Sequence, residues 1–390
     1  MPKNRSSCLH PSQESDELIF EVCQRFLNYY CEEDDSSDTI GKKGPAAKIS
    51  NWLKNERGRP DLTREKIYPL LREAFRRNFL ILKSPVDVSL KEMLQNRFKL
   101  DERQEIDIVK VEGSMASANV SSYAADKVIE LIGLVAEEKR HQAIQEGKNP
   151  DEIKVHLGIG AGYATMLVAK RLALQVNTRE KSPSLVLHTI SSGGFFVEEP
   201  HKSPITYFSY FNNELTKIEY VALFSETFVN REDYKQIRKS PSYRRCFDLK
   251  DEIDIIITSL ASADDIHSLL RQNLEYMIKE KAIPANSLNQ MFQNGFIGDV
   301  QFRPYSQKGV LNEGCPIHAV ALFELNEMVQ FVNKPGKHVV LVGGPCGECG
   351  SLKTEALRPL LANKNLRLWN HLILDIKTAN ELLKTPNKSI

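Results

Sequence analysis

From about residue 104 onward, short apolar runs alternate with amphipathic stretches. Uncharged runs rich in β-branched residues predict strands at 106–111, 154–158, 184–190, 220–223, 253–258, 338–342 and 372–375. Apolar residues at helical spacing predict helices at 121–143, 163–173, 204–216, 231–239, 262–278, 352–362 and 376–383. This alternation is typical of an α/β domain with a doubly wound, mostly parallel sheet that is covered by helices on both faces.

The first hundred residues follow the helical period instead. Helices are predicted at 16–32, 46–55 and 63–78, a polar loop at 33–45, a short strand at 79–83 and a connecting helix at 86–103. Thr63 is the expected N-cap of the third helix, and Pro69 lies six positions after it. Because proline lacks an N–H and crowds the preceding turn, we expect this helix to be kinked or to start near Tyr68. The pattern divides the chain into a helical domain (1–84), a linker helix (85–103) and an α/β domain (104–390).

Charge changes the interpretation of the helical domain. The whole chain of 390 residues has a formal net charge of +1, whereas residues 48–83 hold ten Lys or Arg and four Asp or Glu, a local net charge of +6. These cations fall on a helix–turn–helix pattern, which indicates a DNA-binding domain that contacts phosphates and bases of double-stranded DNA. The alternative is a small helical oligomerisation domain with solvated cations. The candidate DNA-binding residues are Thr63, Arg64, Lys66, Arg72, Arg76 and Arg77.

Hydropathy and cysteine content exclude several classes of protein. Hydrophobic residues make up 41% of the chain, yet no apolar run approaches the roughly 20 residues that span a bilayer. Residues 1–16 are polar and lack the apolar segment of a secretory signal. Seven scattered cysteines are too few for a disulfide framework, so most are expected to be reduced thiols. We therefore expect a cytoplasmic protein with no membrane partner.

Two glycine-rich segments follow predicted strands. In VHLGIGAGYATM, the residues Gly158, Gly160, Gly162 and Thr165 lie where a strand passes into a helix, and free N–H groups at a helix start attract anions. The spacing is not that of a dinucleotide-binding loop, so NAD is disfavoured and no cofactor is expected. In TISSGGF, Ser191, Ser192 and Gly193 could contact a sugar or a phosphate. A tight turn without a ligand is the alternative for either segment.

Two charged residues and two cysteines complete the candidate chemistry. Asp299 follows a glycine in GFIGDVQFR and suits sugar hydroxyls, while Lys353 lies near a helix start after VVLVGGPCGECGS and suits a phosphate. Cys346 and Cys349 form a lone CxxC with no second Cys or His pair nearby in the sequence. The histidines are likewise scattered, at 156, 188, 267, 318 and 338 among others. We therefore expect no catalytic triad and no metal site, and we interpret the CxxC as a flexible glycine-rich loop with incidental thiols; a redox or metal role is the alternative.

In this order and spacing, the segments resemble the SorC family of bacterial transcriptional regulators, which carry a DeoR-like sugar-binding domain. The matching stretches are LGIGAGYATMLVAKRLA, ISSGG, FVNREDYKQIRKSPSYRRCFDLKDEIDIIITSLAS, NGFIGDVQFRPYSQKG, VVLVGG with LKTEALRPLL, and HLILDIKTANELL. The resemblance covers roughly 104–390 and, more loosely, 16–103. The departures are the insertion at 33–45, Pro69, the CGECGS segment before Lys353 and the serines of ISSGG.

The resemblance implies several properties. The fold would be like that of ribose-phosphate isomerase and glucosamine-phosphate deaminase, with an N-terminal winged helix, and the protein would form homo-oligomers such as dimers or tetramers. A phosphorylated sugar would act as the effector and alter operator binding. By position, the residues facing it would be Gly160, Gly162, Thr165, Ser192, Gly193, Asp299 and Lys353.

Three hypotheses remain open at this point. The first is a DNA-binding regulator that responds to a phosphorylated sugar. The second is a sugar-phosphate isomerase or deaminase in which Asp299 or a nearby histidine is the acid or base. The third is a sensor that has lost DNA binding and acts through a protein partner.

Overall fold

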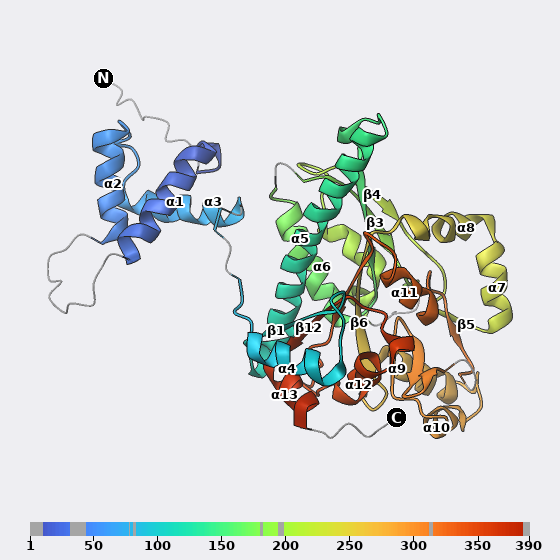
Figure 1. The fold of residues 1–390 in the computed structure, drawn as a ribbon. Coiled ribbons are helices and arrows are strands. Elements are labelled where there is room, and N and C mark those ends of the chain that lie inside the picture. Colours follow the sequence, from blue (N-terminus) through green and yellow to red (C-terminus); the bar gives the residue numbers. More distant parts are fainter. Residues whose placement is uncertain are drawn as a thin grey trace. The chain divides into compact units, whose positions relative to one another are not determined.

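The computed structural model of the chain describes residues 11–31, 44–77, 79–80, 83–179, 182–193, 199–311 and 315–384. The chain forms two compact units, Met1–Leu82 and Lys83–Ile390, which we describe separately. Figure 1 shows the elements of both units and labels the α-helices and several strands.

The smaller unit is helical in its described part. It contains η1 (Pro11–Gln13), α1 (Asp16–Cys31), α2 (Pro45–Glu56) and α3 (Arg64–Arg76). The three α-helices enclose a core that includes Ile19, Ile49, Leu53, Ile67 and Leu70. Apolar side chains at helical spacing thus pack against one another, as the sequence pattern predicts.

Two details of this unit differ from the prediction. Helix α3 begins at Arg64 and continues through Pro69, so the later start near Tyr68 is wrong. Phe79 and Leu80 form a bend rather than a strand, while residues 81–82 and most of the polar loop (32–43) lie outside the described residues. Within residues 11–80, the described part holds no strand that could form a wing.

The larger unit is built on a parallel sheet, which confirms the predicted α/β fold class. The strand order is β1-β12-β11-β6-β2-β3-β4, and every neighbouring pair in this order is parallel. The strands are β1 (Glu105–Val109), β2 (Lys154–Ile159), β3 (Ser184–Thr189), β4 (Ile218–Val221), β6 (Ile255–Ser262), β11 (His338–Val342) and β12 (His371–Asp375). Each overlaps a strand predicted from the sequence.

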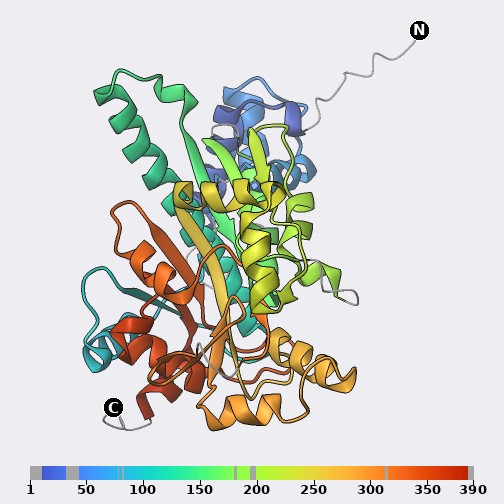
Figure 2. The same cartoon turned by 90° about the vertical axis from the view of Figure 1, so that its right-hand side faces the viewer.

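Helices cover both faces of this sheet (Figures 1 and 2). On one face, Ile255 and Ile257 pack into a core with α5 (Ala116–Gln145) and α6 (Tyr163–Val176). On the other face, Ile256 packs into a core with α4 (Val88–Phe98), α11 (Leu325–Val332), α12 (Thr354–Ala362) and α13 (Ile376–Lys384). Because successive side chains of a strand point to opposite faces, an uninterrupted apolar strand supplies both cores.

Several predicted helices have different bounds. The helix expected at 204–216 is the 3-10 helix η5 (Pro204–Tyr210), and α9 (Leu269–Lys279) begins late because β6 continues to Ser262. The segment expected as a linker forms α4, which packs on β1 and α13. By contrast, the helix expected at 231–239 has the predicted bounds and is α7 (Arg231–Lys239).

The remaining elements are short and were not predicted. They are η2 (Gly113–Met115), η3 (Pro150–Glu152), η4 (Pro200–Lys202), β5 (Phe228–Val229), α8 (Pro241–Asp248), η6 (Leu249–Glu252), α10 (Ser287–Gln293), β7 (Gly298–Val300), β8 (Arg303–Ser306), β9 (Gly309–Val310), β10 (His318–Ala319) and η7 (Lys364–Leu366). Of these, β7 pairs antiparallel with the end of β6 and continues into β8 and β9. In the described ranges, no helix has the length and apolarity needed to cross a membrane.

The topology marks one position at the sheet edge. From β2 the chain proceeds through β3 and β4 toward one edge of the sheet, and it then returns to β6 on the other side of β2. In open α/β sheets, such a reversal leaves a crevice beyond the carboxyl ends of the two strands, where ligands bind. The topology therefore predicts a ligand site beyond the carboxyl ends of β2 and β6.

Candidate functional site

A partly open cavity lies at this position. Its volume is about 670 Å³, including the mouth that faces solvent. The walls come from the loop after β2, the end of β6, the β7–β8 turn and the loop after β11. The lining residues include Ala161, Gly162, Ser259, Leu260, Asp265, His267, Asp299, Gln301, Cys346, Glu348 and Lys353.

Asp299 and Lys353 are buried charged groups in the wall of this cavity. The carboxylate of Asp299 accepts hydrogen bonds from the Phe302 N–H (3.2 Å) and the Ser268 hydroxyl (3.4 Å). Burial raises the pKa of Asp299 to about 7 and lowers the pKa of Lys353. The Nζ of Lys353 donates to the Leu260 carbonyl at 2.9 Å, while an ammonium offers three donors. This amine therefore retains donors for an anionic group in the cavity.

The backbone beside Asp299 is strained. Gln301 and Phe302 have φ values of 52° and 60°, in the left-handed region that non-glycine residues rarely occupy. The Gln301 amide donates to the Thr258 hydroxyl, whereas its Oε1 is buried and lacks a hydrogen-bond partner among the described residues. Strained backbone and buried polar atoms without hydrogen-bond partners are both common at ligand-binding sites. Sequence reasoning missed Gln301, although it lies two residues after Asp299 in the same motif.

The glycines after β2 have three different roles. Gly162 lines the cavity and adopts a φ of +118° at the N-cap of α6. A Cβ on Gly160 would lie 2.0 Å from the Gln301 Nε2, so this glycine allows the glutamine side chain to cross the loop. A Cβ on Gly158 would lie 2.6 Å from Ile190, so this residue serves packing inside the sheet.

The predicted hydroxyl residues lie away from the cavity lining. Thr165 is fully buried and donates to the Gly162 carbonyl at 2.8 Å, within the first turn of α6. Ser191 and Ser192 are fully buried, and the Ser192 hydroxyl accepts from the Ser225 N–H at 3.0 Å. A Cβ on Gly193 would lie 1.8 Å from the Ser203 Oγ. Of the nine predicted effector residues, the structure brings Gly162, Asp299 and Lys353 into the cavity wall.

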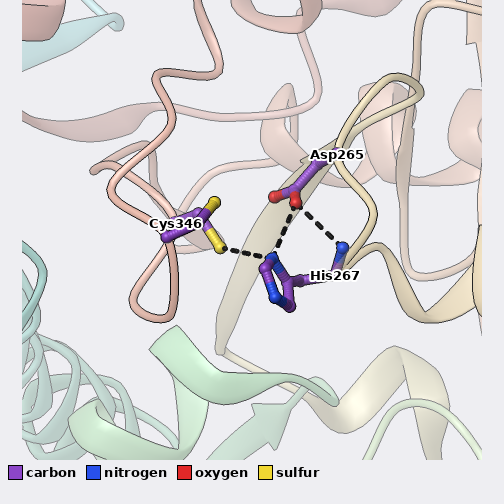
Figure 3. Close-up of side chains that lie close together, drawn as sticks. Asp265, His267 and Cys346 are labelled. Carbon is purple, nitrogen blue, oxygen red and sulfur yellow. Dashed lines mark hydrogen bonds and ion pairs between the residues drawn. The ribbon is translucent and has the colours of Figure 1, made fainter.

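A second group of side chains in the wall was not expected. The CxxC lies in the loop between β11 and α12, and Asp265 and His267 lie in the loop between β6 and α9. Because β6 and β11 are adjacent parallel strands, their following loops meet (Figure 3). Ligand atoms of Asp265, His267, Cys346 and Cys349 all lie within 4.8 Å of one another. The CxxC has no second Cys or His pair near it in the sequence, whereas the folded chain places Asp265 and His267 beside it.

In the smaller unit, the candidate DNA-binding residues divide into two groups. Thr63, Arg64, Arg72 and Arg76 are exposed on α3 or at its N-cap, and Lys66 is half-buried. Arg76 pairs with Glu73 at 3.0 Å, yet its side chain stays 60% exposed. Arg77 is 16% exposed, pairs with Asp16 (2.5 Å) and Glu73 (3.0 Å) and donates to the Glu14 carbonyl (3.0 Å). Arg77 therefore stabilises the unit, whereas the exposed residues are available to a partner.

Comparisons with known proteins agree with this architecture. No family model matches the chain, and no curated protein matches it in sequence. Among solved structures, the full-length sorbitol operon regulator SorC from Klebsiella pneumoniae is 15% identical, with 95% of this chain and 100% of that chain covered and a TM-score of 0.57. A DeoR family transcriptional regulator from Listeria monocytogenes is 16% identical, with 76% and 98% covered and a TM-score of 0.52.

A third solved structure has the same fold. A transcriptional regulator from Streptococcus pneumoniae is 14% identical, with 76% of this chain and 96% of that chain covered and a TM-score of 0.53. At such identities the matches show the fold. The chain thus has the fold of the sugar-binding transcriptional regulators of the SorC and DeoR families.

Proposed function

We propose that the chain is a DNA-binding transcriptional regulator whose larger unit senses a phosphorylated sugar. The observation that carries the proposal is the cavity beyond β2 and β6, where the buried amine of Lys353 and the buried carboxyl group of Asp299 share one wall. A buried amine favours a phosphate, and a carboxyl group favours sugar hydroxyls. This pairing supports a small ligand that carries both groups.

The smaller unit supports the DNA part of the proposal. Arg64, Arg72 and Arg76 are exposed along one helix of a compact three-helix unit. Exposed cations along a helix supply contacts to phosphates, and these contacts position the helix on DNA. The solved structures that share the fold include an operon regulator and a transcriptional regulator, which agrees with this assignment.

A thermal-shift screen tests the sensor part. The full chain is heated with pairs of phosphorylated and unphosphorylated sugars, and the variant Lys353→Met is measured in parallel. We expect at least one phosphorylated sugar to raise Tm for the wild type, its unphosphorylated partner to raise Tm much less, and neither to raise Tm for the variant. Equal shifts in wild type and variant would contradict the role of Lys353.

An enzyme remains the second candidate because of one observation. A carboxyl group with a pKa of about 7, such as that of Asp299, suits a general base at neutral pH. Incubation of the protein with pentose and hexose phosphates, followed by analysis of the products, separates the two functions. If the wild type forms an isomerised or deaminated product and the variant Asp299→Asn does not, the protein is an enzyme rather than a sensor.

A further inference from the structure

We propose that Asp265, His267, Cys346 and Cys349 bind a zinc ion that joins the loop after β6 to the loop after β11. The proposal rests on the identity, spacing and mutual distances of these four side chains. It concerns a site distinct from Lys353 and Asp299, although both sites border the same cavity.

The ligand set is one that zinc prefers. Two thiolates, one imidazole and one carboxylate are all known zinc ligands, and four protein ligands are typical of a structural site. The two cysteines are separated by two residues, which is the usual spacing of a CxxC half-site. Thiolate ligands disfavour magnesium and calcium, which prefer oxygen.

The distances fit a tetrahedral ion. Zinc bonds of about 2.3 Å to sulfur and about 2.1 Å to nitrogen or oxygen separate a nitrogen from an oxygen by roughly 3.4 Å and a sulfur from a nitrogen by roughly 3.6 Å. In the structure, the His267 Nδ1 lies 3.2 Å from the Asp265 Oδ1 and 3.8 Å from the Cys346 Sγ. These side chains point toward one another from two loops (Figure 3).

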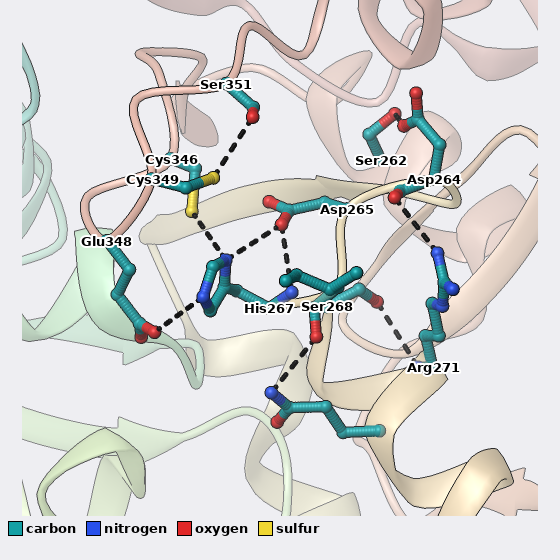
Figure 4. A network of polar contacts seen from close by, with 12 residues as sticks. Ser262, Asp264, Asp265, His267, Ser268, Arg271, Cys346, Glu348, Cys349 and Ser351 are labelled. Atoms are coloured by element: carbon teal, nitrogen blue, oxygen red, sulfur yellow. Dashed lines mark hydrogen bonds and ion pairs between the residues drawn. The ribbon is translucent and has the colours of Figure 1, made fainter.

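The orientation of the imidazole supplies independent support. While Nδ1 faces the cluster, the Nε2 of His267 lies 3.3 Å from a carboxylate oxygen of Glu348 (Figure 4). The same carboxylate pairs with Lys202, whose side chain is 3% exposed. A histidine that binds zinc commonly donates its other N–H to a carboxylate, which fixes the tautomer and the orientation of the ring.

The loop that carries the cysteines is also shaped for a turn around an ion. The Gly350 N–H donates to the Cys346 carbonyl at 2.9 Å, and the Cys346 N–H donates to the Ser351 carbonyl at 2.8 Å. Gly350 has a φ of +73°, which closes this turn. Both cysteines are therefore presented from one short loop, with Cys346 buried and Cys349 exposed. Zinc binding would release the protons of both thiols to solvent.

The metal content of the full chain tests the proposal. Protein purified under reducing conditions without a chelator is expected to hold one zinc ion per chain by elemental analysis. The variant Cys349→Ser should lose most of this zinc, and because this side chain is exposed the variant should retain its circular dichroism spectrum. The matched control is Cys246→Ser, a buried cysteine outside the cluster, which should keep one zinc ion.

The absorption spectrum of bound cobalt reports directly on thiolate ligands, so a cysteine that does not bind the metal would not affect it. Replacement of zinc by Co²⁺ should produce the absorption bands of a tetrahedral ion with two thiolate ligands. In Cys349→Ser at saturating Co²⁺, the sulfur-to-cobalt intensity per bound ion should fall to about half, because one of the two thiolates is removed. A spectrum typical of six oxygen ligands would contradict the proposed set.

The contact of Glu348 with His267 predicts a graded effect. In competition with a chromophoric chelator, Glu348→Gln should bind zinc about 10- to 100-fold more weakly than the wild type. Glu355→Gln, an exposed carboxylate on α12, should leave the zinc affinity unchanged. Wild-type protein that holds no zinc, or a disulfide between Cys346 and Cys349 that persists in reductant, would overturn the proposal. These measurements require neither sugar nor DNA, so their failure would leave the proposed function standing.

Discussion

The two ends of the central strands carry buried charges that are used in different ways. At the amino end, Asp254 precedes β6 and is contacted by the Lys139 Nζ (2.6 Å), the Lys337 Nζ (3.4 Å) and the His156 N–H (2.8 Å). His156 in turn contacts His188, which lies near the carboxyl end of the adjacent strand β3, at 3.0 Å. Burial lowers the pKa of His188 to about 3, so this histidine is neutral in the folded protein at physiological pH. The carboxylate of Asp254 is thus satisfied, whereas the Nδ1 of His188 is buried without a hydrogen-bond partner among the described residues.

At the carboxyl end, the polar groups leave hydrogen-bonding capacity unused. Lys353 and Asp299 share a cavity, the Gln301 Oε1 lacks a partner among the described residues, and the backbone at Gln301 is strained. Burial and charge are thus common to both ends. What distinguishes the ligand site is that its polar groups, including Gln301, Asp299 and Lys353, line one cavity, whereas His188 does not line it.

The largest expected effect is at the amino end. Asp254→Ala would leave Lys139 and Lys337 without their shared carboxylate, and loss of one partner of a buried ion pair costs about 3–5 kcal/mol. We expect urea unfolding to show a decrease of this size in the free energy of unfolding, with ligand affinity unchanged in the folded protein. A variant as stable as the wild type would show that Asp254 does not hold the strand ends together.

The next effect concerns the pH dependence of stability. Because burial raises the pKa of Asp299 from 3.8 to about 7, the folded state retains a proton that the unfolded state releases above about pH 4. Stability should therefore fall as pH rises from about 4 to 7 and then level off, by at most roughly 4 kcal/mol. Asp299→Asn should remove this decrease, as measured by unfolding at pH 5 and pH 8. Identical pH profiles in wild type and variant would mean that the carboxyl group is ionised throughout.

A smaller effect separates ligand binding from folding at Lys353. A ligand at 100 times its Kd stabilises the wild type by about 2.7 kcal/mol, and Lys353→Met should lose most of this stabilisation. Without ligand, the variant should unfold within about 1 kcal/mol of the wild type, because methionine fills the same space without a buried charge. Lys364→Met, at an exposed lysine of the same unit, is the control that should respond like the wild type.

The smallest effects distinguish two arginines in the smaller unit. Arg72→Ala removes an exposed cation and should reduce the slope of log affinity for DNA against log salt by about one, with stability unchanged. Arg77→Ala should instead destabilise the unit, because this guanidinium bonds Asp16 and Glu73. Fluorescence anisotropy over a salt series and thermal unfolding measure the two properties. Lys148→Ala, in the larger unit, should change neither.

The sequence predicted the main strands because their apolar runs are long and uninterrupted. The strands β6 and β11, for example, supply two cores and leave an unambiguous pattern. The small strands β7 to β10 have two to four residues each, too few for a period to be recognised. The predicted helix at 204–216 is longer than the 3-10 helix η5 because apolar residues continue at helical spacing past Tyr210.

The site was predicted less completely, and for a different reason. Asp299 stands out because it is charged and follows a glycine, and Lys353 stands out because it is charged and follows a glycine-rich strand end. Whether Gln301, Asp265 and His267 belong to a site depends on which loops meet in the folded chain. For Asp265 and His267, the adjacent positions of β6 and β11 in the sheet determine which loops meet. Spacing along the chain does not contain this information, because the cysteines lie about eighty residues from their partners.

If the larger unit is a sensor, a ligand in the cavity changes the affinity of the protein for DNA. The direct measurement is the Kd for a DNA fragment selected by the full chain from a random pool, at fixed salt, with and without the sugar phosphate found in the thermal screen. We expect a change of about 5- to 150-fold in the wild type and none in Lys353→Met. An unchanged Kd in wild-type protein saturated with the sugar phosphate would contradict the account.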